Sequence, residues 1–324
     1  MSKAIRFHQT GGPEVLQWDD IDVGEPSDNQ ILVRHTAIGL NYIDTYHRSG
    51  LYPLPLPSTI GMEAAGVVQK VGLNVKEISE GDRIAYASPP PGSYSEERLI
   101  DADKVVKIPS GVSDAIAAAM MLKGLTAQYL IRQIHKVSSG DTILIHAAAG
   151  GVGLIVCQWA KALGANVIGT VSTEEKATLA KTNGCDYPII YTEENFAERV
   201  MDITNGEKLP VVFDSIGKDT FEKSLDCLKP LGKMVSFGQA SGPIPPIDLG
   251  VFAQKGSLFF TRPTLFNYAG TPVALRDMST DLFSVVESGD VKIQIDQEFP
   301  LSEARAAHEA LESRQTTAST ILIP

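Results

Sequence analysis

One stretch of the sequence decides the fold: Asp141-Thr142-Ile143-Leu144-Ile145-His146-Ala147-Ala148-Ala149-Gly150-Gly151-Val152-Gly153. A short apolar segment, typical of a strand, passes through small residues directly into a helical segment. Glycines in such a turn let the backbone approach a pyrophosphate, which the free N–H groups at the helix start then face. We therefore predict dinucleotide binding by Gly150, Gly151, Val152 and Gly153, although Ala148 replaces the first glycine of the usual GxGxxG pattern. A tight turn without a ligand is the alternative.

The segments around this turn alternate between apolar strands and helices. We expect strands at residues 142–145, 166–171, 188–191, 210–213, 234–237 and 258–260, and helices at 151–163, 174–182, 196–204 and 221–228. This alternation is typical of a parallel sheet covered by helices on both faces, and six strands fit the doubly wound dinucleotide-binding order. The sequence therefore predicts an α/β fold for this part of the chain.

The two ends of the chain have a different texture. The first 110 residues predict short strands at 31–38, 65–72 and 83–87, separated by glycine turns and proline-rich loops. Helical segments follow at 115–121 and 127–136. After residue 263 we expect helices at 272–287 and 302–313 and a closing strand at 320–323.

The end of the second predicted strand indicates which nicotinamide nucleotide is bound. An acidic residue is expected there if the ribose 2′-OH of NAD is bound, but residues 169–173 contain none. Ser172 and Lys176 instead suit a 2′-phosphate, which indicates NADPH. A solvated Lys176 is the alternative, and Glu174 and Glu175 count against the phosphate site unless they serve the positive end of the next helix.

Two further strand ends carry candidate ligand-binding residues. Ser215 follows the strand at 210–213, and Phe237, Gly238 and Gln239 follow the next one. Doubly wound folds bind ligands at the carboxyl ends of their strands. Ordinary loop chemistry is the alternative for both segments.

Charge and cysteine content argue against several classes of protein. The net charge of −11 disfavours nucleic acid and anionic membranes as partners, since both attract clustered Lys and Arg. Three scattered cysteines predict no zinc cluster and no disulfide framework. The N-terminus has no apolar signal-peptide core and no apolar run is long enough to span a membrane, so we expect a soluble cytoplasmic protein.

Several longer strings carry a family resemblance. They are residues 146–165, 11–16 (Gly11-Gly12-Pro13-Glu14-Val15-Leu16), 43–53, Lys123-Gly124-Leu125-Thr126 and Glu312-Ser313-Arg314. In these the chain resembles the NADPH-dependent quinone oxidoreductases, the zeta-crystallin-like branch of the zinc-free medium-chain dehydrogenase/reductases. The resemblance covers essentially the whole chain.

The resemblance implies a Rossmann doubly wound parallel sheet inserted into a GroES-like β-rich catalytic domain. Residues 1–124 plus 265–324 would form the catalytic domain and residues 125–264 the NADPH-binding domain, with a cofactor cleft at their junction. It also implies a homodimer that pairs edge strands near residues 257–261. Zinc-dependent members carry Cys and His ligands where this chain has Asn41 and Met62, so we expect no metal.

The same resemblance implies roles for residues near the cofactor. Asn41, Tyr46 and Tyr52 would lie beside the nicotinamide, where Tyr O–H and Asn N–H₂ are neutral donors for a carbonyl; packing aromatics are the alternative for the tyrosines. Thr126 would begin a stretch touching the nicotinamide, or simply cap a helix. The remaining candidates are Tyr191 at the adenosine, Phe260 and Thr261 through main-chain groups, Arg262 facing the cofactor, and Arg314 at a phosphate. The alternative is core packing for Tyr191 and sheet packing for Phe260 and Thr261. It is a surface ion pair for Arg262 and a helix cap for Arg314.

The expected function is zinc-independent reduction of quinones by NADPH, with Tyr46, Asn41 and Arg262 as catalytic residues. A hydride step and single-electron reduction both remain open. One alternative is a zinc-free NADPH-dependent reductase of enones or enoyl thioesters. Another is a non-catalytic NADPH-binding protein of the crystallin or sensor type.

Overall fold

The computed structural model describes residues 2–313 and 316–324, and these divide into two compact units. The first, called here the β-rich unit, comprises the described residues of 1–125, 268–287 and 293–324. The second, called the Rossmann unit, comprises residues 126–267 and 288–292. No helix among the described residues is long and apolar enough to cross a membrane.

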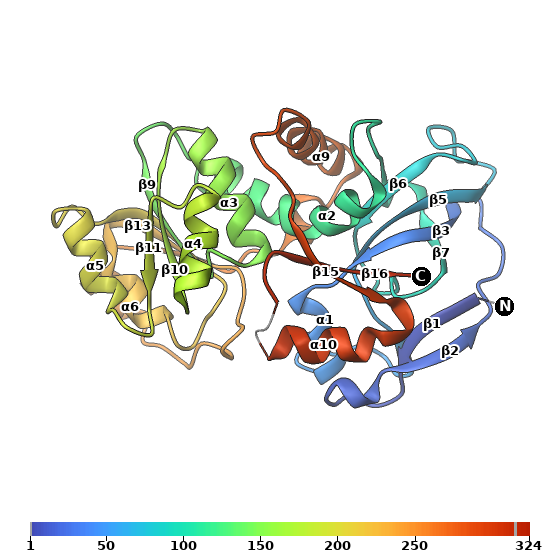
Figure 1. Cartoon of the computed structure of the whole chain (residues 1–324), viewed down its shortest axis with the longest axis horizontal. Coiled ribbons are helices and arrows are strands. Elements are labelled where there is room, and N and C mark those ends of the chain that lie inside the picture. The colour runs from blue at the N-terminus through green and yellow to red at the C-terminus, as the bar shows by residue number, and fades with distance from the viewer. Residues whose placement is uncertain (1, 314–315) are drawn as a thin grey trace. The chain divides into compact units, whose positions relative to one another are not determined.

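The Rossmann unit is built on a six-stranded sheet in the order β11-β10-β9-β12-β13-β14, and every neighbouring pair is parallel. The strands are β9 (Thr142–His146), β10 (Asn166–Val171), β11 (Tyr187–Ile190), β12 (Leu209–Asp214), β13 (Leu228–Ser236) and β14 (Phe259–Thr261). The helices include α3 (Gly151–Ala162), α4 (Glu174–Thr182), α5 (Phe196–Ile203), α6 (Phe221–Asp226) and α7 (Gly250–Gln254). Figure 1 shows α3 and α4 on one side of these strands and α5 and α6 on the other. The doubly wound parallel sheet is therefore confirmed.

Apolar side chains explain why these segments form a central sheet. Ile143, Leu144 and Ile145 of β9 are fully buried, as expected for a strand covered on both faces. The main error in the predicted bounds is β13, which begins six residues earlier than the expected 234–237. Its first half runs through Lys229, Pro230 and Gly232, which give no apolar pattern.

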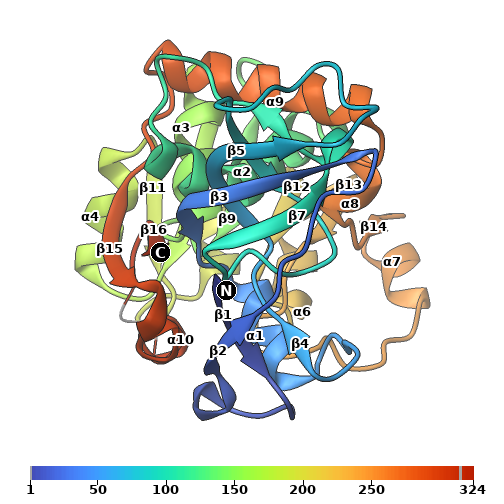
Figure 2. The same ribbon diagram turned by 90° about the vertical axis from the view of Figure 1, so that its right-hand side faces the viewer.

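The β-rich unit contains two sheets. One has the order β2-β1-β4, with β1 (Ser2–Phe7), β2 (Gln17–Ile21) and β4 (Ser58–Thr59). The other has the order β15-β16-β3-β5-β6-β8, with β7 paired to β3; its strands are β3 (Gln30–Gly39), β5 (Glu63–Val71), β6 (Arg83–Ala87), β7 (Glu97–Asp101), β8 (Val106–Lys107), β15 (Ile295–Pro300) and β16 (Ser319–Ile323). Figure 2 shows β3 beside β5 and β7. The three predicted strands of the N-terminal part and the closing strand are confirmed.

Some helices of the β-rich unit were predicted accurately and others were missed. The α9 helix (Pro272–Glu287) has the predicted bounds, and α10 (Ala304–Glu312) is two residues shorter at its start. The helix α1 (Tyr42–Ser49), the strand pair β1–β2 and the strand β15 were not predicted. The remaining short elements are α8 (Leu265–Tyr268) and the 3-10 turns η1 (Pro13–Val15), η2 (Ala102–Lys104) and η4 (Leu301–Glu303).

The two helical segments expected at 115–121 and 127–136 form one continuous element instead. The helix α2 runs over Asp114–Gln128 and passes directly into a π-helical segment, η3, over Tyr129–Ile134. Thr126 therefore lies inside α2, and its alternative role as a helix cap is wrong.

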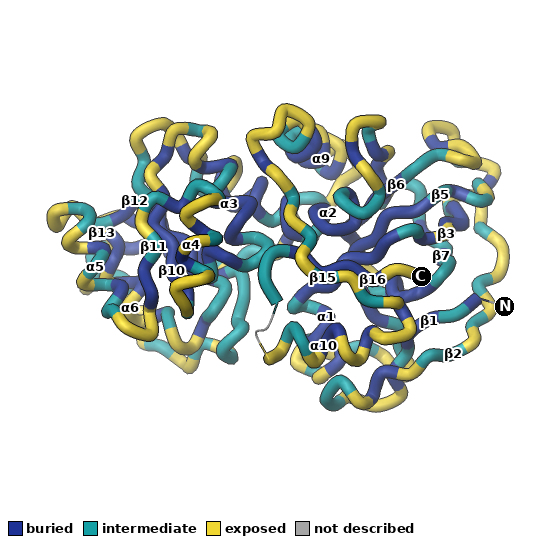
Figure 3. The backbone as a smooth tube through the Cα atoms, in the orientation of Figure 1, coloured by how far each residue is buried: buried dark blue, intermediate teal, exposed yellow. Residues whose placement is uncertain are grey.

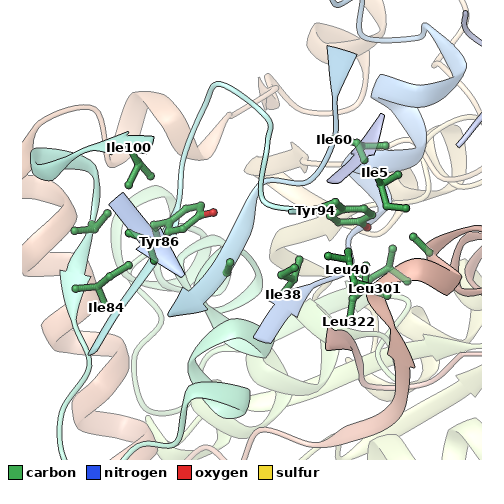
Figure 4. Close-up of a cluster of buried hydrophobic side chains, with 14 of the residues drawn as sticks. Ile5, Ile38, Leu40, Ile60, Ile84, Tyr86, Tyr94, Ile100, Leu301 and Leu322 are labelled. Carbon is green, nitrogen blue, oxygen red and sulfur yellow. The ribbon is translucent and has the colours of Figure 1, made fainter. Parts of the chain in front are cut away.

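A hydrophobic core joins the two chain ends within the β-rich unit. Figure 4 shows Ile5, Ile60 and Tyr94 packed together, with Leu301 and Leu322 from the C-terminal segment nearby. Figure 3 shows buried residues along the central strands of each sheet and exposed residues in loops and along helices such as α9 and α10. The C-terminal segment is thus part of the same core as β5.

Three buried histidines make the β-rich unit sensitive to acid. Burial lowers the pKa of His35 and of His47 to about 4, and that of His308 to about 3, from an ordinary 6.5. These rings are neutral in the folded state, so their contribution to stability is present above pH 6.5 and is lost as the pH falls toward 4. Burial raises the pKa of Asp44 from 3.8 to about 7. Between these two pH values the folded protein holds one proton on Asp44 that the unfolded chain does not, which partly offsets the loss of stability caused by the histidines.

We therefore expect these four groups to lower the free energy of unfolding by about 2.7 kcal/mol per pH unit near pH 5, because they bind about two more protons in the unfolded chain. Denaturant unfolding at a series of pH values measures this slope. Asp44→Asn removes the opposing carboxyl and should steepen the slope by about 1.4 kcal/mol per pH unit. A stability that stays flat between pH 6.5 and 5 would contradict the assignment of neutral buried histidines.

Candidate active site

The glycine turn after β9 is shaped by close backbone approach. Ala147 has a positive φ of 55°, and Gly150 is the extended residue that precedes α3, with φ −83° and ψ 170°. A Cβ on Gly153 would lie 2.2 Å from the Ala147 carbonyl oxygen and 2.8 Å from the Ala148 backbone. Only glycine fits at 153, and the first N–H groups of α3 have no acceptor within the helix. The turn therefore fits a pyrophosphate at its helix start.

His146, at the end of β9, is a core residue. Its Nδ1 lies 2.8 Å from Thr170 Oγ1 and its Nε2 lies 2.8 Å from Ser224 Oγ. Burial lowers its pKa, so the ring is neutral. His146 is therefore a buried histidine with both ring nitrogens hydrogen-bonded.

Ser172, Lys176 and Tyr191 lie at the carboxyl ends of the neighbouring parallel strands β10 and β11. The Tyr191 N–H donates to the Val171 carbonyl over 3.0 Å, and the tyrosine is 42% exposed. Thr173 begins α4, with its Oγ1 accepting from the Lys176 N–H over 3.3 Å. Glu174 and Glu175 occupy the first turn of α4, where their charges suit the helix dipole.

The loops after β12 and β13 are fixed against each other. The buried carboxylate of Asp214 accepts the N–H groups of Ile216 and Gly217 and the hydroxyl of Thr220. The Ser215 carbonyl accepts the Ala240 N–H over 3.1 Å. A Cβ on Gly238 would lie 2.6 Å from the Ser215 carbonyl oxygen, so glycine is needed there. Ser215, Phe237, Gly238 and Gln239 are thus brought together at one edge of the sheet.

Residues at the end of β14 complete this edge. Phe260 pairs with Met234 and Thr261 with Val235 across the parallel β13–β14 ladder. Arg262 follows directly, and its Nη1 donates to the Ser236 carbonyl over 2.8 Å. All six strands therefore end at one edge, which holds every predicted residue of the Rossmann unit except Thr126 in α2. Arg314 lies outside the described residues.

Asn41, Tyr46 and Tyr52 are grouped around α1 in the β-rich unit. The rings of Tyr46 and Tyr52 meet edge to face with centroids 5.2 Å apart, and Tyr42 adds a third ring 6.2 Å from Tyr46. The Tyr52 N–H donates to the Tyr46 carbonyl over 3.0 Å. The aromatic packing expected as an alternative is therefore present, and Tyr42 is a member that no sequence pattern singled out.

Asn41 precedes α1 and contacts a buried charge pair. Its Nδ2 donates to Glu63 Oε1 over 2.7 Å, and Lys123 Nζ donates to the same oxygen over 2.9 Å. Glu63 is 0% exposed and Lys123 7%. Lys123 begins one of the strings that carry the family resemblance, but no role was predicted for it. It stands in an Ala- and Met-rich helix 60 residues from its partner.

The residues at the positions of the zinc ligands do not fit zinc. Asn41 gives its amide nitrogen to Glu63, the Met62 thioether is a poor zinc ligand, and the Glu63 carboxylate is already bound by an ammonium group. No three of the described His, Cys, Asp and Glu side chains are grouped so as to hold a metal ion. We therefore derive no chemistry through a metal.

The two units together define a medium-chain dehydrogenase/reductase. Residues 27–110 match the alcohol dehydrogenase GroES-like domain, and residues 151–272 match the zinc-binding dehydrogenase family. A quinone oxidoreductase of Pseudomonas aeruginosa is 54% identical over 325 residues, covering all of both chains. The chain belongs to the quinone oxidoreductase family of these proteins.

Solved structures agree with this assignment. The crystal structure of Escherichia coli quinone oxidoreductase complexed with NADPH superposes with a TM-score of 0.98 at 51% identity, covering 99% of this chain and 100% of that one. The crystal structure of a 2-haloacrylate reductase superposes with a TM-score of 0.89 at 47% identity, covering 99% of each chain.

Proposed function

We propose that this protein is an NADPH:quinone oxidoreductase that works without a metal. The observation that carries the proposal is the full-length identity of 51–54% to quinone oxidoreductases, one of them crystallised with NADPH. The fit of the Gly150–Gly153 turn to a pyrophosphate supports it. NADPH would supply the reducing equivalents, and the chain's own residues would bind, orient and exclude water.

The residues at the strand ends of the Rossmann unit would hold the nucleotide. Ser172 and Lys176 would bind the 2′-phosphate, Tyr191 would stack at the adenosine, and the turn at Gly150–Gly153 would take the pyrophosphate. Ser215, the loop of Phe237, Gly238 and Gln239, and the Phe260–Thr261 main chain would line the remainder of the nucleotide. Arg314 would pair a phosphate, and Thr126 would touch the nicotinamide.

Asn41, Tyr46 and Tyr52 would lie beside the nicotinamide, and Tyr46, Asn41 and Arg262 would be the catalytic residues. A quinone is already a good electron acceptor, so hydrogen bonds that orient its carbonyls suffice and strong acid catalysis is not required. The proton that completes hydroquinone formation would be taken from water.

A panel of acceptors tests this proposal. Purified protein should oxidise NADPH rapidly with ortho- or para-quinones, and slowly or not at all with enones and enoyl thioesters. Because a 2-haloacrylate reductase of Burkholderia sp. is 48% identical over 335 residues, 2-haloacrylates belong in the panel. Turnover of enones or haloacrylates alone would overturn the quinone assignment. Tight NADPH binding with no turnover of any acceptor would favour a sensor.

We further propose a cytoplasmic homodimer that pairs the edge strands β14. Phe259 is 59% exposed and Phe260 41% exposed on this edge strand, as expected of residues that a second copy covers. Phe259→Lys should convert the dimer to a monomer in light-scattering measurements. Leu73→Lys changes an 89% exposed leucine in the β-rich unit and should leave the dimer intact. A wild-type protein that is monomeric at micromolar concentration would refute this pairing.

A further inference from the structure

A buried ion pair in the β-rich unit joins α2 to β5 directly beside Asn41. The Lys123 ammonium donates to Glu63 Oε1 over 2.9 Å and to the Leu40 carbonyl over 3.1 Å. The Leu122 N–H donates to Glu63 Oε2 over 2.5 Å. Both oxygens of a fully buried carboxylate are therefore bound, one of them by two donors.

The backbone is shaped to admit this pair. A Cβ on Gly39 would lie 2.2 Å from Glu63 Oε1 and 2.3 Å from the Ala118 carbonyl oxygen. Gly39 has no positive φ, so glycine is required here for space alone. Burying a lysine and a glutamate is costly unless both are fully hydrogen-bonded. A chain that needed only to fill this volume would be served as well by apolar residues, so the charges have another use.

The pair fixes which way the Asn41 amide points. A carboxylate paired with an ammonium group accepts hydrogen bonds and donates none, so the amide atom 2.7 Å from Glu63 Oε1 is Nδ2. The second hydrogen of Nδ2 faces the Gly39 carbonyl at 3.5 Å, and the Asn41 main-chain N–H donates to Asp44 Oδ2 over 2.9 Å. The amide hydrogens therefore point into the protein. Oδ1 faces the Asp44 N–H in the capping box that begins α1, and its second lone pair is left to meet a ligand.

We propose that Lys123 and Glu63 are positioning residues that hold Asn41 as a hydrogen-bond acceptor for an N–H or O–H group of the bound nicotinamide nucleotide. This corrects the donor role expected for Asn41 from its residue type. The inference rests on the proposed function, in which Asn41 lies beside the nicotinamide. Lys123 pairs with the carboxylate and holds it in place, Glu63 binds the amide nitrogen, and the amide oxygen is thereby aimed at the nucleotide.

A double-mutant cycle tests whether Lys123 acts through Asn41. Lys123→Met, Asn41→Ala and the double variant are compared by titrating NADPH fluorescence for Kd and by thermal unfolding. We expect each single variant to raise the Kd roughly tenfold, and Lys123→Met to add less than about twofold in the Asn41→Ala background. An equal effect of Lys123→Met in both backgrounds would overturn the proposal, since a purely structural role gives additive losses.

A matched control separates positioning from stability. Arg83→Met breaks a half-buried pair with Asp114 in the same unit, where the two side chains are 35% and 21% exposed. It should lower the unfolding midpoint without changing the Kd for NADPH. If Lys123→Met does not fold, the neutral pair Lys123→Met with Glu63→Gln avoids an unpaired buried charge. That double variant should fold, and its affinity for NADPH should be lower than that of the wild type. An affinity equal to that of the wild type would overturn the positioning role.

The binding readout also keeps this inference distinct from the proposed function. If the protein binds NADPH but reduces no quinone, the quinone proposal fails, while the cycle on Kd still tests the positioning role. If Asn41→Ala leaves the Kd unchanged, Asn41 does not meet the nucleotide, and the positioning proposal fails even where quinones are reduced.

Discussion

Gly153→Val is expected to abolish nucleotide binding by the Rossmann unit. The new Cβ would overlap the Ala147 carbonyl oxygen and the Ala148 backbone, and neither can move aside as a flexible side chain can. The start of α3 must then shift away from the turn, which removes its N–H groups from the pyrophosphate. We expect a loss of more than about 100-fold in NADPH affinity and a destabilisation of about 1–3 kcal/mol.

A valine elsewhere in α3 provides the control for this variant. Ala162 is exposed in the last turn of the helix, so Ala162→Val places the same β-branched side chain in the helix without touching the turn. It should leave the Kd for NADPH unchanged. Unaltered binding by Gly153→Val would mean that the turn does not hold the nucleotide.

Lys176→Ala is expected to remove most of the discrimination between NADPH and NADH. A lysine that pairs a 2′-phosphate makes a charge-assisted hydrogen bond, whose loss costs about 1.5–3 kcal/mol, or roughly 10- to 100-fold in kcat/KM for NADPH. NADH lacks the phosphate, so its kcat/KM should not change. Steady-state kinetics with a fixed quinone and each nucleotide in turn measure both values.

Lys181→Ala is the matched control for the phosphate site. Lys181 is exposed in the last turn of the same helix, so removing it alters the net charge equally but leaves the end of β10 intact. Its kcat/KM for NADPH should stay within about twofold of wild type. Equal losses for NADPH and NADH in Lys176→Ala would show that Lys176 supports the fold and does not read the phosphate.

The Rossmann unit was largely predictable because its elements are specified locally. Most of its strands contain a short apolar run, such as Ile143-Leu144-Ile145 in β9, and helices follow β9, β10 and β11 within a few residues. Parallel strands then bring their carboxyl ends to one edge, so residues as distant in sequence as Ser172 and Arg262 are collected by topology alone. The first half of β13 was missed because Lys229 and Pro230 resemble a loop.

The β-rich unit was less predictable because long-range pairing decides it. Half-exposed alternation in β15 and the short β2 gives little periodic signal, and these strands form because partner strands are available to pair with them. The cluster of Asn41, Glu63 and Lys123 has no sequence pattern, since its members come from three separate segments. Its chemistry follows only from hydrogen-bond geometry, in which the Asn41 amide nitrogen donates to buried Glu63.

The central claim is that this chain reduces quinones with NADPH, and a single kinetic comparison tests it most directly. Purified protein is mixed with one para-quinone and with either NADPH or NADH, and nucleotide oxidation is followed at matched concentrations. We predict quinone-dependent oxidation of NADPH with a kcat/KM at least about tenfold above that for NADH. Equal rates with the two nucleotides would contradict the phosphate site, and no oxidation of NADPH by any quinone would contradict the function.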